Sequence, residues 1–183
     1  MDRYKDIVDQ AISDLSHAIL AITQRDNIKY TLKPHTTNNF NTMVDNYNNS
    51  GILEVSIEGC DTSIYKSPAV NLLARVFHDR VHIQKSLDFS EEHELKIAKI
   101  QRGEIFNQCK LAGLSNLRAS RAAILLYIDI ADQVKYFYKY NKFVENQYTF
   151  VIERFKRYLA MESKSNTPDD FLKVYSEYAS QIS

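Results

Sequence analysis

The chain has 183 residues, of which 44% are hydrophobic and 25% are charged, a composition that is ordinary for a soluble globular domain. Its 23 Lys and Arg residues balance its 23 Asp and Glu residues, so no basic excess points to nucleic acid and no acidic excess points to a DNA mimic. No run approaches the roughly 18 apolar residues of a membrane span, and the amphipathic N-terminal segment does not predict a secretory signal. We therefore predict one cytoplasmic domain over residues 1–183.

Residue usage predicts a reducing environment and a helix-rich fold. The two cysteines, Cys60 and Cys109, are far apart and form neither a metal knuckle nor a disulfide framework, so we expect two buried thiols. The chain has only 4 Gly and 3 Pro, but 12 Tyr and 9 Phe. This balance favours helices whose core and surface use aromatic rings heavily.

The N-terminal third predicts a helix, a loop and a small sheet. Apolar residues recur at helical spacing over residues 2–24, which are predicted to form an amphipathic helix. Residues 33–50 contain a proline and a Thr/Asn cluster, which is typical of an irregular connection. Dense β-branched residues on either side of Gly59 then predict a short β-hairpin over residues 52–66.

The rest of the chain predicts further helices. Ser67 and Pro68 form a strong helix start, because serine can cap free amides and proline suits the first helical position. Ser90 is predicted to cap a second helix, whose acidic first turn suits the positive helix end. The predicted helices span residues 68–86, 90–111, 117–140 and 143–159, followed by a flexible link over 160–167 and a last helix that begins at Thr167 and Pro168.

The predicted fold class is therefore mainly α. The segment Ala122–Ala131 is apolar nearly all round, so it is predicted to be a central buried helix around which the other helices form a bundle. The hairpin near residues 52–66 is the predicted β element. Residues 52–159 form the predicted core, and residues 160–183 form a C-terminal link and helix.

A polar stripe interrupts the helix predicted over residues 68–86. Asn71, Arg75, His78 and His82 fall at positions i, i+4, i+7 and i+11, which lie on one helix face. Two imidazoles four residues apart can reach one metal ion. Asp79 stands where the catalytic base stands in the helical His-Glu-x-x-His pattern of zinc peptidases, although aspartate is one methylene shorter than glutamate.

Polar residues on two later helices extend this candidate centre. Glu94 and Gln101 follow a seven-residue spacing on the second helix, and a short turn makes that helix an antiparallel neighbour of the stripe. His78, His82 and Glu94 would then ligate a divalent ion, zinc or manganese, and leave an open position as in catalytic zinc sites. The supporting residues are predicted to be Asn71, Arg75, Gln101, Asp129, Asp132 and Gln133. Either aspartate could orient a ligating imidazole or act as a further ligand.

Ordinary structural roles account for several of the same residues. Asp79 could pair with Arg75 or Arg80, and Glu94 could answer the helix dipole. Asp129, Asp132 and Gln133 could form a hydrogen-bond network with Tyr127 or Tyr136. His17 and His35 lie far from the stripe, and His93 is expected to face solvent. The sequence contains no serine-hydrolase elbow and no phosphate-binding glycine loop.

The stripe and the residues that follow it resemble an uncharacterised family of bacteriophage proteins. The resemblance covers roughly residues 52–155 and rests on the pattern Asn71, Arg75, His78-Asp79, His82, Phe89, Glu94, Asp132-Gln133, Tyr136, Gln147 and Phe150. In two places this chain departs from the family, which has glycine where His93 and Asp132 stand. The resemblance implies a phage-encoded protein that acts in the bacterial host cytoplasm, and it implies no particular reaction.

Two functional hypotheses follow from these residues. In the first, the protein is a metal-dependent hydrolase in which Asp79, or an aspartate behind the ligands, activates water. In the second, it is a noncatalytic phage protein that binds a host or defence factor, and the cluster is a structural polar network. The aromatic runs Tyr136–Tyr140 and Tyr175–Tyr178 would then supply interface anchors. Nucleic-acid binding by Arg154, Lys156, Arg157 and Tyr158 is the less favoured third hypothesis.

Overall fold

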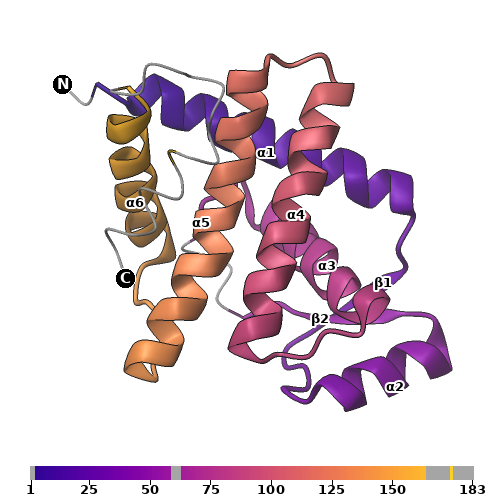
Figure 1. The fold of residues 1–183 in the computed structure, drawn as a ribbon. Coiled ribbons are helices and arrows are strands. Elements are labelled where there is room, and N and C mark those ends of the chain that lie inside the picture. Colours follow the sequence, from indigo (N-terminus) through magenta and orange to yellow (C-terminus); the bar gives the residue numbers. More distant parts are fainter. Residues whose placement is uncertain (1–2, 59–62, 164–173, 175–183) are drawn as a thin grey trace.

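The computed structural model describes residues 3–58, 63–163 and 174. In this part of the chain, six helices and two short strands follow one another (Figure 1): α1 (Lys5–Asp26), β1 (Tyr30–Lys33), α2 (Phe40–Ser50), β2 (Leu53–Ser56), α3 (Pro68–Lys85), α4 (Glu91–Leu111), α5 (Asn116–Tyr140) and α6 (Gln147–Glu162). The predicted mainly helical fold is confirmed. None of the described helices combines the length and apolar character that crossing a bilayer requires.

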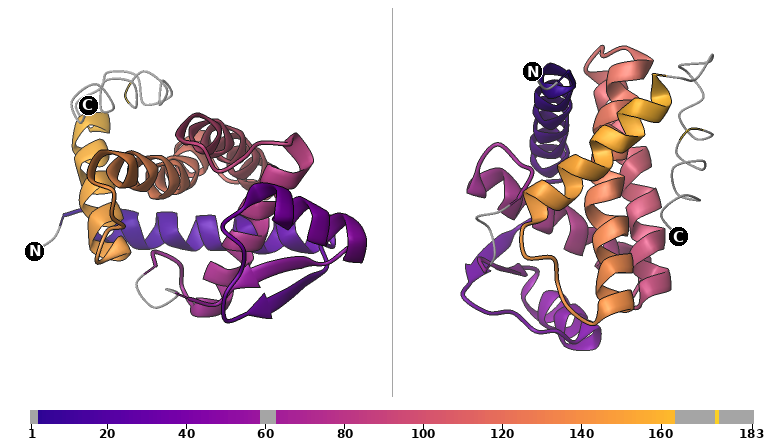
Figure 2. Two further views of the ribbon diagram at one scale, coloured as in Figure 1. Left: turned by 90° about the horizontal axis from the view of Figure 1, so that it is seen from below. Right: turned by 90° about the vertical axis from the view of Figure 1, so that its left-hand side faces the viewer.

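The core is built around α5, as predicted. Every residue from Ala122 to Asp129 is buried, so this segment has no solvent-facing side. Helices α4 and α5 run side by side, α1 crosses one face of this pair, and α6 packs against α5 (Figures 1 and 2). Ile19 of α1, Ile105 of α4 and Phe155 of α6 are fully buried in the same cluster. Burial of these apolar side chains is the main favourable contribution to the stability of the bundle.

The predicted β-hairpin over residues 52–66 is wrong. Strand β2 pairs in parallel with β1, from Tyr30 opposite Leu53 to Lys33 opposite Ser56. Parallel strands need a crossover connection, and α2 supplies it. The described residues from 63 to 66 form no strand, and residues 59–62 lie outside the described part.

The segment predicted as an irregular connection contains this crossover helix. The Asn39 side chain accepts a hydrogen bond from the Thr42 amide and so begins α2. Met43 of α2 then packs on Leu53 and Val55 in a small second core. Asparagine and threonine have low helix propensity, so their cluster concealed a helix that tertiary contacts stabilise.

The remaining boundaries differ by a few residues. Helix α6 begins at Gln147 instead of residue 143, because Asn146 caps the Thr149 amide at 2.8 Å. It continues to Glu162, three residues into the predicted link. The last predicted helix, from Thr167, lies outside the described residues except for Val174, which is buried. Cys109 is buried as expected, whereas Cys60 lies outside the described part.

Candidate metal centre and adjoining cavity

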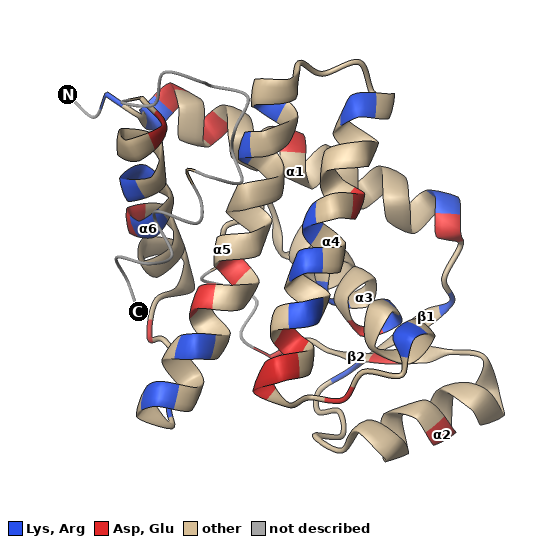
Figure 3. Cartoon of the chain, in the orientation of Figure 1, with Lys and Arg blue, Asp and Glu red and all other residues tan. Residues whose placement is uncertain are grey.

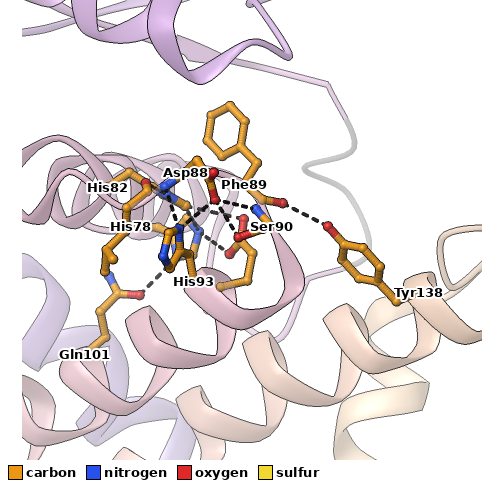
Figure 4. A network of polar contacts seen from close by, with 10 residues as sticks. His78, His82, Asp88, Phe89, Ser90, His93, Gln101 and Tyr138 are labelled. Atoms are coloured by element: carbon orange, nitrogen blue, oxygen red, sulfur yellow. Dashed lines mark hydrogen bonds and ion pairs between the residues drawn. The ribbon is translucent and has the colours of Figure 1, made fainter.

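Local sequence places the two histidines on consecutive turns of α3. Ser67 caps this helix by accepting a hydrogen bond from the Val70 amide, as predicted. The helix ends where Ser86 adopts a left-handed conformation with φ of 51°. His78 and His82 therefore project side by side, with ring centroids 4.7 Å apart (Figure 4).

The turn after α3 returns the chain so that α4 lies against the histidines. His78 Nε2 is 3.2 Å from Glu94 Oε2, and His82 Nε2 is 3.4 Å from Glu94 Oε1. The predicted approach of Glu94 to both imidazoles is thus present. Glu94 belongs to the acidic first turn of α4, which Figure 3 shows in red. It therefore lies near the positive end of that helix and also contacts both histidines.

Hydrogen bonds at the far side of each ring fix which nitrogens face Glu94. His82 Nδ1 lies 2.7 Å from the Leu87 carbonyl oxygen, which can only accept, so this nitrogen carries the proton and donates. His78 Nδ1 lies 3.0 Å from the Gln101 Oε1 atom, the same relation (Figure 4). In the neutral rings, both Nε2 atoms are then left with lone pairs.

Those two lone pairs point at each other across a short gap. The Nε2 atoms of His78 and His82 are 3.0 Å apart. Two unprotonated nitrogens at this distance repel, so a cation between them, either a proton or a metal ion, removes the conflict. This short contact is stronger evidence for a cation-binding site than the His-x-x-x-His spacing alone.

The donor set fits a divalent metal ion. One ligand atom from each of His78, His82 and Glu94 lies within 4.8 Å of the others. A tetrahedral zinc ion with bonds of about 2.0–2.1 Å has ligand atoms about 3.3 Å apart. The two Nε2 atoms are 3.0 Å apart, and they lie 3.2 and 3.4 Å from the two different oxygens of Glu94, distances close to that value. Two imidazoles and one carboxylate, each imidazole held from behind by an oxygen, match a zinc site with one open position.

Electrostatics at the centre favour a positive charge between these groups. Burial lowers the pKa of His78, but the hydrogen bond and negative charge of Glu94 outweigh it and raise that pKa to about 9. Burial raises the pKa of Glu94, whereas hydrogen bonds from His78 and His82 lower it below its usual range. A proton on His78 and a metal ion therefore compete for the same place.

A cavity of about 740 Å³ adjoins the centre and gives it access to solvent. His78, Glu94 and Gln101 line it, whereas His82 is fully buried behind them. The cavity lies between the stripe face of α3 and the face of α5 that carries Asp129. A ligand in the cavity would therefore approach the centre from the side of His78 and Glu94.

The predicted base, Asp79, lines the same cavity and is half-buried. Burial raises the pKa of its carboxyl, and the charges of His78 and His82 oppose that rise. Of its two alternative structural partners, Arg80 binds Asp26 and Glu104 instead, whereas the charge of Arg75 still acts on the Asp79 carboxyl and lowers its pKa. Asp79 makes no hydrogen bond to any described residue, so its oxygens remain available to water or substrate.

The other stripe residues support the cavity wall. Asn71 is buried and lines the cavity. Arg75 also lines it and donates a hydrogen bond of 2.9 Å from Nη1 to the Ser56 carbonyl, which ties α3 to β2. Asn71, Arg75 and His78 of the predicted stripe therefore line one wall of the cavity, and His82 lies buried behind it.

The predicted roles of Asp129 and Asp132 as partners of the imidazoles are wrong. Gln101 and the Leu87 carbonyl occupy the Nδ1 positions, and Asp129 instead binds Tyr65, Gln133 and Gln147. Burial raises the pKa of Asp129, and the hydrogen bond from Gln147 opposes that rise most strongly. Asp132 pairs with Arg154 at 3.5 Å. The tyrosine that binds Asp129 is therefore Tyr65, and not Tyr127 or Tyr136 as expected.

The turn between α3 and α4 holds residues that sequence reasoning assigned differently. Ser90 begins α4 but makes no capping bond, because its hydroxyl binds Asp88 instead. His93 also binds Asp88, at 2.7 Å, and takes no part in the centre. Tyr138 of α5 donates to the Phe89 carbonyl at 3.0 Å (Figure 4), and both residues line the cavity.

Three contributors to the site were not predicted as site residues. The Leu87 carbonyl is backbone, so no residue type signals it. Tyr65 precedes α3 in a segment predicted as part of a hairpin, and nothing in its spacing indicated Asp129. Gln147 appeared within the family resemblance, which was the signal that could have identified it.

Comparison with known proteins found no match: no described family, no curated protein and no solved structure is significantly similar to the chain.

The residues of the nucleic-acid hypothesis do not form an open patch, because Tyr158 is fully buried and Arg154 pairs with Asp132 and covers the Phe150 ring. The second aromatic run, Tyr175–Tyr178, lies outside the described residues.

Proposed function

We propose that the protein is a metal-dependent hydrolase that holds one divalent ion, zinc or manganese, on His78, His82 and Glu94. The observation that carries the proposal is the arrangement of the two Nε2 atoms, which face each other at 3.0 Å while both Nδ1 atoms are occupied by oxygens. A divalent ion at this centre supplies Lewis acidity toward water and toward a carbonyl or phosphoryl oxygen. Origin from a phage and action in the host cytoplasm stay predictions of the family resemblance.

Each side chain has a definite task in this proposal. Gln101 and the Leu87 carbonyl hold the imidazoles in the tautomer that presents Nε2. Asp79 accepts the proton of a water molecule in the cavity, because its carboxylate is near the centre and has no hydrogen-bond partner among the described residues. Arg75 keeps α3 and the β2 edge together, so the cavity keeps its shape.

A second candidate function follows from the same short contact. A proton in place of a metal ion also satisfies the two Nε2 atoms, and the centre would then be a structural polar network in a protein that binds a host or defence factor. The pKa of His78, raised to about 9, favours this reading at neutral pH. Exposed Tyr138 and Tyr140 would serve as interface anchors.

Metal analysis separates the two functions. Purified protein is expected to contain one equivalent of zinc or manganese, or to take up one equivalent of zinc after chelator treatment and dialysis. His78→Ala is expected to lose it. The matched control is His93→Ala, which removes a histidine next to Glu94 that binds only Asp88, and it should retain the metal.

Activity tests the catalytic half of the proposal. Asp79→Asn should keep one equivalent of zinc and lose hydrolysis of whichever ester, amide or phosphoester substrates the wild-type protein cleaves. A protein that binds no zinc, with His78→Ala and wild type equally stable in zinc, would overturn the hydrolase proposal and leave the structural network.

A further inference from the structure

A second polar group faces the same cavity from the side of α5. Asp129 is 4% exposed and lies among the cavity-lining residues. Its Oδ2 atom accepts a hydrogen bond of 2.9 Å from the Tyr65 hydroxyl. Its Oδ1 atom accepts bonds of 2.9 Å from the amide nitrogens of Gln133 and Gln147. Three segments of the chain thus converge on one buried carboxylate.

No described residue forms an ion pair with this carboxylate, although the charge of a protonated His78 favours its ionised form. Its three donors are neutral, and the nearby guanidinium of Arg154 pairs with Asp132 instead. A buried charge without an ion-pair partner is costly, and such a group in a cleft is a candidate for binding a ligand that supplies the missing charge or donor. The arrangement therefore leaves a place for a cationic or strongly donating group.

The two glutamines make this wall rich in acceptors. Because Gln133 and Gln147 both turn their Nε2 atoms to Asp129, their Oε1 atoms are left as acceptors, and no described residue donates to either oxygen. Both side chains line the cavity. Several hydrogen-bond acceptors on one wall of the cavity match a ligand that presents N–H donors.

Aromatic rings stand next to the acceptor wall. Phe137 and Phe143 stack with centroids 4.7 Å apart and an interplanar angle of 30°, and both line the cavity. Phe143 is 78% exposed, so its outer face is open. Such a ring packs well against a flat group and attracts a delocalised cation.

The charge of the cavity argues against an anionic ligand. Four carboxylates line it, those of Glu54, Asp79, Glu94 and Asp129, and Arg75 is the guanidinium that joins them there. Even a dication on the metal ligands, added to Arg75, does not outweigh these four carboxylates. Polyanionic substrates such as nucleoside triphosphates would therefore find no net attraction.

We infer that the cavity binds a substrate through a planar group with several N–H donors, an amidine, a guanidine or an amino-substituted heterocycle, which docks on Asp129, Gln133 and Gln147. The inference deepens the proposed function, because the remainder of the same substrate would then extend toward His78 and Glu94, where the proposed hydrolysis occurs. The proposed class of ligand follows from Asp129, Gln133 and Gln147 and does not depend on a metal ion.

Binding of benzamidine tests this inference, with benzoate as the probe of equal shape and opposite charge. Two-dimensional NMR of chelator-treated protein should show benzamidine shifting the side-chain amide signals of Gln133 and Gln147, while benzoate leaves them unchanged. Benzamidine should bind with or without zinc. Asp129→Asn, which keeps the side-chain volume, should weaken its binding at least about tenfold, because a charge-assisted pair becomes a neutral one.

A second variant keeps the test decisive if Asp129→Asn does not fold. Val134→Phe adds bulk from α5 into the cavity and leaves the Asp129 carboxylate in the sequence, so it should also abolish benzamidine binding. Absent benzamidine binding, equal binding of benzoate, or unchanged binding in folded Asp129→Asn would overturn the inference. Zinc uptake that persists in Asp129→Asn would leave the proposed metal centre standing in that case, and benzamidine binding without zinc uptake would leave this inference standing alone.

Discussion

Helix α3 carries two clusters of charged side chains that differ in one respect. On one side Arg80, which is 8% exposed, binds Asp26 of α1 and Glu104 of α4. On the other side His78 and His82 meet Glu94 of α4. Both clusters join α3 to α4 through a carboxylate. The Arg80 cluster is absent from the cavity lining, whereas the histidine cluster opens onto it.

The difference shows what separates a structural ion cluster from a candidate site. Arg80 is a permanent cation and Asp26 also binds Arg25, so the two carboxylates, Asp26 and Glu104, are answered by permanent cations of the chain itself. The histidines bring a variable charge, and their Nε2 atoms conflict unless a cation joins them. A cluster that is complete in itself stabilises the fold, and one that needs an added cation beside a cavity can bind and act.

Replacing Arg80 should produce the largest loss of stability. Arg80→Leu leaves two carboxylates without their shared cation and should lower the free energy of unfolding by about 3 kcal/mol, measured by urea denaturation. Arg118→Leu is the control, because Arg118 also binds a carboxylate, Asp14, but its side chain is 42% exposed. The control should lose clearly less stability, because solvent screens the exposed Arg118 side chain.

Zinc uptake should survive that change. Folded Arg80→Leu is expected to bind one equivalent of zinc, as wild type does, since Arg80 contributes nothing to the centre. Zinc loss in Arg80→Leu but not in Arg118→Leu would mean that the two clusters of α3 are one unit, and the comparison between them would fail.

Zinc should stabilise the wild-type protein by a slightly smaller amount. At a free zinc concentration of 100 times Kd, ligand binding adds about 2.7 kcal/mol to the free energy of unfolding. His78→Ala should show no zinc-dependent rise in Tm, whereas His93→Ala should show the full rise. An equal rise in all three proteins would place the zinc elsewhere on the chain.

Loss of the hydrogen bond behind His78 should weaken the metal without removing it. Gln101→Leu keeps the size of the side chain but frees the His78 ring to turn, so zinc affinity should fall about 10–100-fold, measured by competition with a chromophoric chelator. Gln108→Leu is the matched control, because Gln108 lies two turns further along α4 and lines a different pocket. A similar loss in both variants would indicate a general weakening of α4.

The sequence predicted the parts of this molecule that depend on helical periodicity. The stripe on α3, the antiparallel approach of Glu94 and the buried middle of α5 all follow from spacing that a single helix or helix pair determines. The proposed ligand set needed only the additional assumption that a short turn makes neighbours of α3 and α4. Gln101 was placed correctly for the same reason.

What failed depends on contacts between distant segments. The parallel pairing of Tyr30 with Leu53 requires a crossover helix that Asn- and Thr-rich residues conceal. The partners of Asp129 come from residue 65 and from the start of α6, and helical spacing on α5 carries no information about either. The histidine partner at Leu87 is a carbonyl, which every residue possesses.

The change of stability with pH should be the smallest of these effects, because the side chains of His78 and Glu94 are partly exposed to solvent. In chelator-treated protein, the pKa of His78 is raised from 6.5 to about 9 by Glu94. The folded state therefore holds a proton that the unfolded state releases, and the resulting stabilisation is complete below about pH 6.5 and disappears as pH rises through about 9. Urea midpoints should fall over this window in wild type, beyond any fall in His78→Ala.

Zinc should remove this dependence and so separate the two kinds of cation. A bound zinc ion takes the place of the His78 proton, so the zinc-loaded protein has no proton to lose between pH 6.5 and 9, and its urea midpoint should stay nearly level there. Below pH 6.5 the zinc-loaded protein becomes the pH-sensitive form, because protons compete with zinc for the histidines and the stabilisation by zinc shrinks as pH falls. Identical slopes with and without zinc would show that the metal ion does not lie between the histidines, and the contrast with the self-sufficient Arg80 cluster would disappear.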